Sequence, residues 1–234
     1  MFLFQHKIKL ADTGFFIGFT DFHSHLLPGV DDGVKTLEEA LKTLDYFSLL
    51  GIKKVILTPH VMNGMSDNWE HVIQSFNILC QQYHGEIEMS LGAEYMLDSG
   101  FEKRVEKGLQ YLDNDRILVE TSYLSPPNNL YEQLYNLSVV GNTPVIAHPE
   151  RYLYMKQSDY HQLKNHDYLL QLNLLSLSGY YGKQVMKKAI YLLEQEMYDL
   201  IGTDLHNVKT FQMWIKKLKV TNSQLKKLTT IKLK

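Results

Sequence analysis

The chain has 234 residues, 44% of them hydrophobic and 21% charged, which excludes a disordered or fibrous protein and allows a substantial buried core. No apolar run reaches the roughly 20 residues of a membrane-spanning helix, and Met1 to Thr20 lacks the pattern of a secretory signal, so we expect a cytoplasmic protein. The formal net charge of -2 is unevenly spread, because the residues after Asp204 hold eight lysines and no acidic side chain.

Short β-rich apolar runs alternate with longer helical patterns along the chain. The predicted strands are Phe16–Phe22, Lys53–Leu57, Ile87–Leu91, Ile117–Glu120, Pro144–Ala147, Tyr168–Leu172 and Asp199–Ile201. The predicted helices, with apolar residues three and four positions apart, are Leu37–Leu50, Trp69–Tyr83, Asn129–Val140 and Lys183–Gln195. This alternation predicts parallel βαβ units and favours a closed or nearly closed α/β barrel over a doubly wound sheet. No glycine-rich phosphate-binding loop follows the first strand, which argues against a nucleotide-binding fold.

We expect one domain over residues 1–234, since α/β barrels of about 200–250 residues fold as one unit. Residues 1–15 are predicted to be an N-terminal extension, and residues 208–234 a lysine-rich C-terminal tail. The tail lysines are spaced like the solvated face of a terminal helix, which we favour over contact with nucleic acid or a membrane surface. Nothing in the pattern predicts an oligomeric state.

Metal-capable side chains fall at the ends of the predicted strands. They are His23, His25, His60, Glu94, Glu120, His148, Asp204 and His206. Parallel strands of a barrel present their carboxyl ends at one rim, so these residues are expected to converge there. The single cysteine, Cys80, excludes an intrachain disulfide and an all-thiolate site, so any metal must be held by nitrogen and oxygen.

Each of these features also has an ordinary structural explanation. The His23-Ser24-His25 spacing arises by chance on strands, and Asp31-Asp32-Gly33 is a good turn sequence. The two glutamates could be a helix cap and an edge-strand charge, and Asp204 could be a helix N-cap. The joint pattern favours a metal site, because five of the ten histidines and three carboxylates are unlikely to share one rim by chance.

The remaining histidines, and the cysteine, are assigned no chemistry. We expect His6, His71, His84, His161 and His166 to be surface residues. Cys80 follows Ile78 and Leu79 in a helical pattern and is predicted to be a buried small hydrophobe. No arginine-containing phosphate loop follows it, which argues against a cysteine phosphatase.

Seven ordered segments carry a family resemblance. They are Thr20-Asp21-Phe22-His23-Ser24-His25, Leu27-Pro28-Gly29-Val30-Asp31-Asp32-Gly33, Thr58-Pro59-His60, Gly92-Ala93-Glu94, Val119-Glu120, Ala147-His148-Pro149-Glu150-Arg151-Tyr152 and Thr203-Asp204-Leu205-His206-Asn207. Together they resemble the polymerase and histidinol phosphatase (PHP) family. The match is nearer to its bacterial protein-tyrosine phosphatase branch, which is encoded with capsule and exopolysaccharide systems.

This resemblance implies a distorted TIM-like (β/α)7 barrel with three divalent metal ions. It assigns His23, His25, Glu94 and Asp204 to the first ion, Glu94, Glu120 and His148 to the second, and Asp32, His60 and His206 to the third. A sulfur-free ligand set suits Mn²⁺, Fe or Zn²⁺. We favour Mn²⁺, which is the usual activator in this branch.

The predicted chemistry is phosphomonoester hydrolysis. Clustered metal ions about 3.5–4 Å apart neutralise the phosphoryl charge and generate hydroxide near neutral pH. Arg151, three residues after His148, is positioned to bind phosphoryl oxygens and stabilise the transition state, although it could instead form a salt bridge with Glu150. The branch often has an arginine after the Asp204 segment, where this chain has Lys209, so Lys209 is a candidate substrate-binding residue.

We therefore predict a metal-dependent protein-tyrosine phosphatase, with Arg151 and Asp204 as catalytic residues. The resemblance implies a phosphotyrosine protein substrate, namely a bacterial tyrosine autokinase that controls polysaccharide export. One alternative is a small-molecule phosphatase, such as one acting on histidinol phosphate. Another is an inactive regulatory partner that keeps its metal ions for structure.

Overall fold

The computed structural model describes residues 6–65 and 68–233. Its strands are β1 (Lys7–Lys9), β2 (Thr20–Ser24), β3 (Lys54–Leu57), β4 (His60–Val61), β5 (Glu88–Leu91), β6 (Glu94–Met96), β7 (Arg116–Glu120), β8 (Thr143–Ala147), β9 (Leu169–Asn173), β10 (Leu200–Gly202) and β11 (Lys219–Thr221). The α-helices are α1 (Leu37–Leu50), α2 (Trp69–Gln82), α3 (Phe101–Lys107), α4 (Leu130–Val139), α5 (Gln157–Asn165), α6 (Lys183–Glu194), α7 (Val208–Ile215) and α8 (Asn222–Lys232). Short 3-10 helices are η1 (Leu10–Thr13), η2 (Pro149–Arg151) and η3 (Leu174–Ser178).

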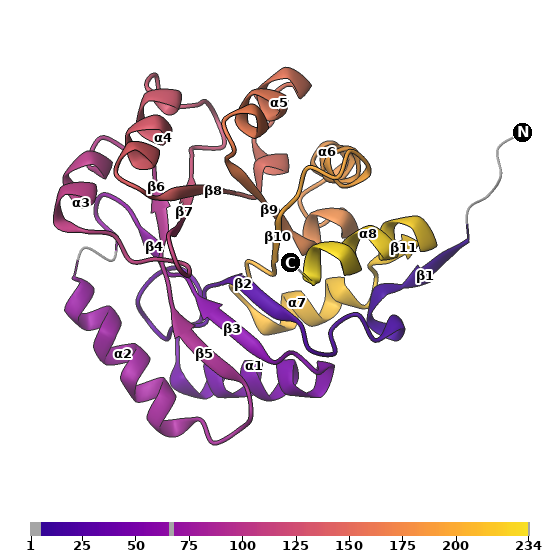
Figure 1. The fold of residues 1–234 in the computed structure, drawn as a ribbon. Helices are drawn as coiled ribbons and strands as arrows, with labels where there is room; N and C mark the ends of the chain where they lie inside the picture. The colour runs from indigo at the N-terminus through magenta and orange to yellow at the C-terminus, as the bar shows by residue number, and fades with distance from the viewer. Residues whose placement is uncertain (1–5, 66–67, 234) are drawn as a thin grey trace, which may run out of the picture.

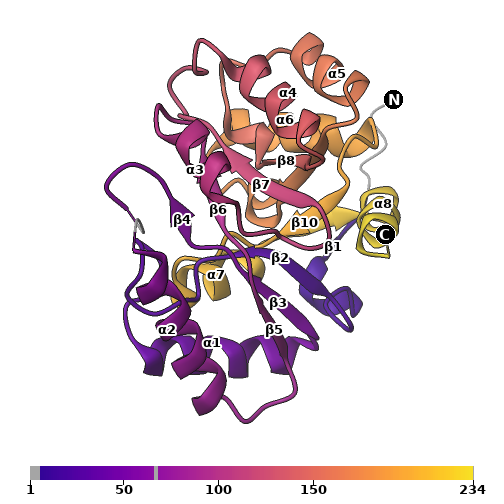
Figure 2. The same ribbon diagram turned by 60° about the vertical axis from the view of Figure 1, so that its left-hand side comes forward.

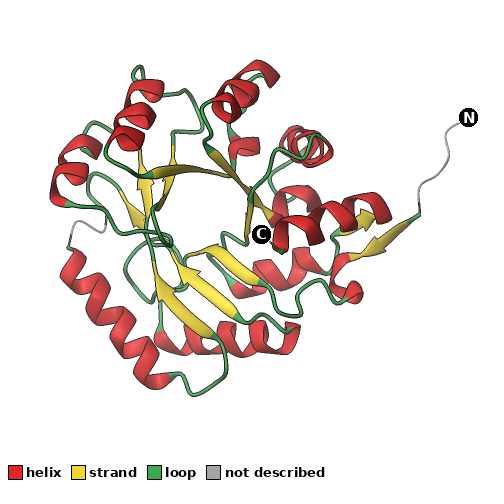
Figure 3. Cartoon of the chain, in the orientation of Figure 1, coloured by secondary structure: helices red, strands yellow, loops and turns green. Residues whose placement is uncertain are grey.

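The strands form a curled, parallel α/β arrangement with helices on the outside (Figures 1 and 3). A six-stranded parallel sheet has the order β10-β9-β8-β7-β6-β4, and a three-stranded parallel sheet has the order β2-β3-β5. Figure 2 shows α1 and α2 beside the smaller sheet, with α3 to α6 around the larger one. The predicted α/β class and parallel strands are confirmed.

The chain passes twice from the smaller sheet to the larger one through a two-residue interruption. The path of β3 continues into β4 after Thr58 and Pro59, and that of β5 continues into β6 after Gly92 and Ala93. Proline lacks an amide hydrogen and cannot donate to a sheet ladder, so a break at Pro59 follows from its chemistry. The two sheets also meet where the segments after β2 and β10 lie side by side, and there the backbone amide of His25 donates to the carbonyl of Leu205 (3.0 Å).

The apolar core has two layers, because both faces of the parallel strands are buried. A small inner cluster comprises Ile56, Leu112, Leu118, Val145, Ala147 and Leu200. Alternate residues on the same strands, such as Val55 and Leu57 on β3, belong to the larger cluster that packs under the helices. This two-residue alternation is typical of strands and leaves their carboxyl ends free to carry polar side chains.

Most predicted elements are confirmed, with shifts of one residue at their ends. The first strand was predicted from Phe16 but begins at Thr20. Phe15, Phe16 and Phe19 instead pack their rings together with centroids 5.3–5.8 Å apart, in a turn that fills the core. Their apolar character reflects burial and not strand pairing.

Both terminal segments pack onto the body of the protein. The strand β1 pairs antiparallel with β11, with Lys7 opposite Thr221. The ammonium of Lys232 on α8 donates to the carbonyl of Phe15 (2.9 Å). Lys216, Lys217, Lys219 and Lys226 are exposed, as expected for solvated lysines. Within the described residues, no helix is long and apolar enough to cross a bilayer.

The prediction for Cys80 was wrong, whereas that for the unassigned histidines was right. Cys80 is exposed on α2, because the buried stripe of that helix runs through Val72, Ser75 and Leu79 and leaves the next position facing solvent. His6, His71, His84, His161 and His166 are all exposed.

Candidate metal centre

The structure brings the nine predicted metal-ligand side chains together at the carboxyl ends of the strands. His23 lies in β2, His60 begins β4, Glu94 begins β6 and Glu120 ends β7. The remaining five, His25, Asp32, His148, Asp204 and His206, lie in the segments that follow β2, β8 and β10. His60 and Glu94 are register partners in adjacent parallel strands, which sets their side chains next to each other. Four overlapping sets of these side chains have the compactness of metal sites: His25, Asp32, His60 and His206; His23, His25 and Asp204; His23, Glu94 and His148; and His60, Glu94 and Glu120. Because they share members, they combine into three groups.

The first group surrounds the space between β2 and β10. The Nε2 atoms of His23 and His25 are 3.0 Å apart, and they lie 3.1 and 3.3 Å from Glu94 Oε2. Asp204 Oδ1 is 3.5 Å from the first nitrogen and 3.3 Å from the second. Ligand atoms about 2.1 Å from one ion stand about 3.4 Å apart at the corners of a tetrahedron, and these five separations of 3.0–3.5 Å are close to that value.

Both histidines of this group are oriented through their second ring nitrogen. His23 Nδ1 lies 3.0 Å from Gln171 Oε1, and His25 Nδ1 lies 2.8 Å from Asp31 Oδ2. Because both partners are acceptors, each Nδ1 donates, and Nε2 is the ring nitrogen left to face a metal ion. Burial alone would raise the pKa of Asp31, but the charge of His25 and its hydrogen bond hold that pKa well below its usual range.

The second group lies across β4, β6, β7 and β8. His60 Nδ1 is 3.0 Å from Glu94 Oε2 and 2.9 Å from Glu120 Oε1, and His148 Nε2 is 3.0 Å from Glu94 Oε1. Four buried atoms here have no hydrogen-bond partner among the described residues: His60 Nδ1, Glu94 Oε2, Glu120 Oε1 and His148 Nδ1. Buried polar atoms are normally satisfied, so the carboxylate oxygens Glu94 Oε2 and Glu120 Oε1, which meet beside His60 without a hydrogen bond, fit a cation.

The third group is nearer to solvent. His206 Nε2 and His60 Nε2 lie 3.3 and 3.5 Å from Asp32 Oδ1. The ring of His25 stacks on that of His206 with centroids 4.0 Å apart. His60 therefore faces the third group through Nε2 and the second group through Nδ1. The family resemblance implied a role for His60 in the third group alone.

Charge in the cluster is balanced only if cations are present. Burial would raise the pKa values of Glu94 and Asp204, but neighbouring histidine charges, with Arg151 beside Asp204, hold both well below their usual range. Burial and His25 would lower the pKa of His60, yet Glu94 and Glu120 raise it to about 10. Glu94 and Asp204, both buried, thus stay ionised and need positive charge, which protonated histidines or metal ions provide.

The backbone is held in unusual conformations at this centre. His148 and Asp204 have φ values of 34° and 50°, in the left-handed region that residues other than glycine rarely adopt. Such strain is typical of functional sites. At Gly202 a Cβ atom would lie 2.2 Å from Gln171 Nε2 and 2.4 Å from His23 Cβ, so glycine is required where β10 passes the first group.

Arg151 points to Asp204 and not to Glu150. Its Nη1 donates to Asp204 Oδ2 (2.6 Å), and its guanidinium lies between the rings of Tyr123 and Tyr181, 4.4 and 4.2 Å from their centroids. Glu150 is buried, and its carboxylate accepts hydrogen bonds from the backbone amide of Asn173 and from the hydroxyl of Tyr198. The salt bridge considered from the sequence is therefore absent, because Glu150 has other partners.

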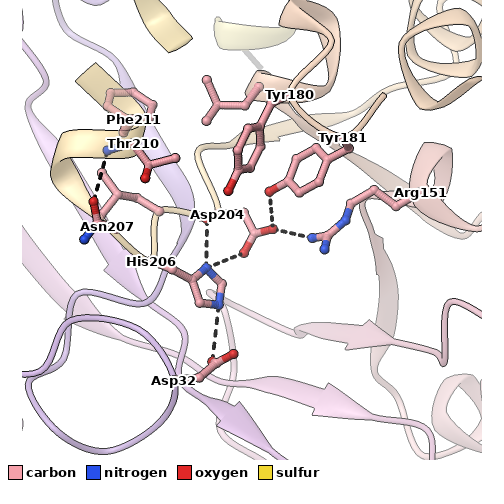
Figure 4. Close-up of a pocket in the computed structure, with 11 residues that line it drawn as sticks. Asp32, Arg151, Tyr180, Tyr181, Asp204, His206, Asn207, Thr210 and Phe211 are labelled. Atoms are coloured by element: carbon pink, nitrogen blue, oxygen red, sulfur yellow. Dashed lines mark hydrogen bonds and ion pairs between the residues drawn. The ribbon is translucent and has the colours of Figure 1, made fainter. Parts of the chain in front are cut away.

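A pocket of about 240 Å³ opens beside Arg151 and the first and third groups (Figure 4). It is lined by Asp32, Arg151, Leu175, Tyr180, Tyr181, Asp204, Leu205, His206, Asn207, Thr210 and Phe211. Lys209 is exposed in the first turn of α7 and is not among these lining residues.

Several residues of the centre were not singled out from the sequence. Gln171 and Asp31 orient the histidines, while Asn173 donates to Asp204 Oδ2 (2.7 Å). Tyr123 and Tyr181 sandwich the arginine. The one usable signal was the position of Gln171 and Asn173, because polar residues within the buried strand Leu169–Asn173 need partners.

Comparison with known proteins agrees with this geometry. A family model for capsular polysaccharide synthesis, CpsB/CapC, matches residues 19–227. The tyrosine-protein phosphatase CpsB of Streptococcus agalactiae serotype V is 29% identical over 205 residues, which cover 80% of this chain and 83% of that protein. The tyrosine-protein phosphatase YwqE of Bacillus subtilis is 28% identical over 211 residues, which cover 81% and 78%.

Solved structures extend the likeness to the fold. A chain from the crystal structures of YwqE from Bacillus subtilis and CpsB from Streptococcus pneumoniae, described as unique metal-dependent tyrosine phosphatases, matches with a TM-score of 0.72 and 28% identity over 82% of this chain and 81% of the other. The phosphotriesterase homology protein of Escherichia coli, with a TM-score of 0.53 and 12% identity over 84% and 85%, shares the fold alone. Because the family model spans nearly all of its length, the chain belongs to the CpsB/CapC family of capsular polysaccharide synthesis.

Proposed function

We propose that this protein is a metal-dependent protein-tyrosine phosphatase. The observation that carries the proposal is the cluster of nine candidate nitrogen and oxygen ligands beside Arg151, in which buried oxygens of Glu94 and Glu120 lack hydrogen bonds among the described residues. The names of the relatives CpsB and YwqE support it. We also propose that the two sheets together form the distorted (β/α)7 barrel of the PHP type.

The metal centre is proposed to hold three divalent ions. His23, His25, Glu94 and Asp204 would hold the first, Glu94, Glu120 and His148 the second, and Asp32, His60 and His206 the third, with His60 Nδ1 also facing the second. Mn²⁺ is the favoured ion, and Fe and Zn²⁺ suit the same donors. When bound, such ions neutralise the phosphoryl charge and make hydroxide available near neutral pH.

The chain's own residues bind and orient the phosphoryl group. Arg151 borders the pocket and presents a cation fixed by two tyrosine rings and by Asp204. Asp204 belongs to the first group through Oδ1 and accepts a hydrogen bond from Arg151 through Oδ2. It therefore links Arg151 to the histidines of that group. A fixed guanidinium stabilises developing negative charge without reorganising, as a preorganised donor should.

Phosphotyrosine is the proposed substrate, carried on a protein such as a bacterial tyrosine kinase. Its phenolate has a conjugate-acid pKa of about 10, so it can leave with little general-acid help. A small phosphomonoester such as histidinol phosphate is the alternative. Substrate contact by Lys209 and a cytoplasmic location stay predictions from the sequence.

Metal removal and substrate comparison test this proposal. The purified protein is chelated, analysed for metal content, and reloaded separately with Mn²⁺, Fe²⁺ or Zn²⁺. Turnover of a phosphotyrosine peptide is expected to vanish on chelation, return with metal, and exceed turnover of histidinol phosphate. His148→Ala should abolish turnover while the circular dichroism spectrum stays that of a folded protein. Full activity after complete chelation would refute the proposal.

A further inference from the structure

The pocket beside Arg151 has two chemically different ends. Arg151, Asp204 and His206 form a polar floor next to the metal groups. Leu175 and Phe211, which are 3% and 1% exposed, contribute apolar walls. With the proposed metal ions beside Arg151, a ligand that fits both ends has an anionic group joined to an apolar body.

Tyr180 is the most exposed aromatic side chain of this wall. It is 39% exposed, and its ring packs against Trp214 on α7 and against Tyr181, with centroids 5.4 and 4.5 Å apart. Figure 4 shows Tyr180 between Thr210 and Tyr181, above Asp204. Neighbouring rings thus fix one face of Tyr180 and leave part of the ring available to a ligand.

The size of the pocket fits an aromatic ring. Its volume is about 240 Å³. An apolar cavity of about 150 Å³ in another protein is enough to bind benzene. A phenyl ring and part of an attached phosphoryl group can therefore enter together.

We propose that this wall is an aryl subsite, in which the phenyl ring of phosphotyrosine lies against Tyr180 while its phosphoryl group reaches Arg151. The inference rests on the proposed function and adds to it the part of the pocket that selects aryl over alkyl phosphomonoesters. Aromatic rings attract one another in offset or edge-to-face arrangements, which an alkyl leaving group cannot reproduce.

Two non-hydrolysable phosphonates test the subsite by binding alone. Phenylphosphonate and methylphosphonate are titrated calorimetrically into the metal-loaded protein. The wild-type protein should bind the phenyl compound more tightly, and Tyr180→Ala should reduce that preference about five- to tenfold while methylphosphonate binding stays unchanged. Tyr180→Phe should retain the preference because it keeps the ring. Tyr135→Ala, at a tyrosine on α4 that is 61% exposed, serves as the matched control.

The outcomes separate this inference from the proposed function. A wild-type protein without preference for phenylphosphonate would overturn the aryl subsite, as would a Tyr180→Ala variant that weakens both phosphonates equally. Failure of the wild-type protein to hydrolyse a phosphotyrosine peptide would instead remove the proposed function, while the phosphonate titration still reports on the subsite.

Discussion

The two sides of the metal centre differ in how their ligands are held. On the braced side, formed by His23, His25 and Asp204, each side chain has a further partner: Gln171, Asp31, or Arg151 with Asn173. On the open side, formed by His60, Glu120 and His148, each side chain has a buried nitrogen or oxygen without a hydrogen-bond partner among the described residues. Glu94 lies between the sides and faces histidines of both.

This difference separates what the fold arranges from what metal ions must complete. A buried polar atom left unsatisfied costs about 1–3 kcal/mol. The braced side avoids that cost through hydrogen bonds to the protein, whereas the open side depends on positive charge from protonated histidines or from bound metal ions. Metal binding should therefore stabilise the open side most, and substitutions on the two sides should have different consequences.

The largest effect is expected at Glu94, where the two sides meet. Glu94→Gln removes a charge that faces His23, His60 and His148, so both sides should lose metal affinity. Turnover of a phosphotyrosine peptide should fall by about a thousandfold or more, since clustered metal ions contribute several kcal/mol of transition-state stabilisation. Glu88→Gln, on an exposed carboxylate paired with Lys54, is the matched control. Retention of a substantial part of the activity would refute a bridging role.

Arg151 should show the next largest effect, because it couples the braced side to the substrate. Arg151→Ala is expected to lower kcat and kcat/KM together by about 10²–10³, the size of a well-placed electrostatic donor. Arg151→Lys should recover little, because an ammonium cannot reproduce planar stacking between Tyr123 and Tyr181. Steady-state kinetics at saturating metal measure both variants. An unchanged kcat would mean that Arg151 only positions Asp204.

Gln171 tests whether bracing itself contributes to metal affinity. Gln171→Met removes the acceptor for His23 Nδ1 at similar side-chain size, and affinity for the first ion should fall about 10–100-fold, as for other partners of metal-bound histidines. Turnover at saturating metal should change less than the affinity does. Metal titration followed by calorimetry gives the constants, with Gln110→Met, which loses a bond to the Leu91 carbonyl, as control. Equal affinity in Gln171→Met and the wild-type protein would show that the braced histidines need no partner.

The sequence predicted which side chains meet at one rim, because their position relative to the strands is a local property. Eight of the nine follow or end a run whose period is readable, and parallel pairing then brings the ends together. Asp32 was added by the family resemblance alone. The strands β4 and β6 were missed, since two- and three-residue strands carry too little periodicity to recognise. The partners of the braced side were missed for another reason: Gln171 lies 148 residues from His23 along the chain, and only the tertiary fold makes them neighbours.

The wrong prediction for Cys80 shows that apolar neighbours in the sequence do not reveal which face of a helix is buried. Its neighbours Ile78 and Leu79 made the segment look buried, yet Ile78 is 51% exposed and Leu79 is fully buried. One residue is about 100° of helical rotation, so apolar neighbours alone do not fix the side that faces the core.

The smallest effect is expected at Cys80. It lies exposed on α2, away from the described residues that line the pocket, and burial of part of its side chain raises the pKa of the thiol, so little thiolate forms near neutral pH. Cys80→Ser should keep nearly all activity and change the free energy of unfolding by no more than about 0.5 kcal/mol, as surface substitutions usually do. Alkylating the folded, metal-loaded protein should leave turnover intact, whereas chelation should abolish it. A trapped phosphocysteine, or inactivation by alkylation with metal still bound, would assign the nucleophile to the thiol and leave both sides of the metal centre with a structural role only.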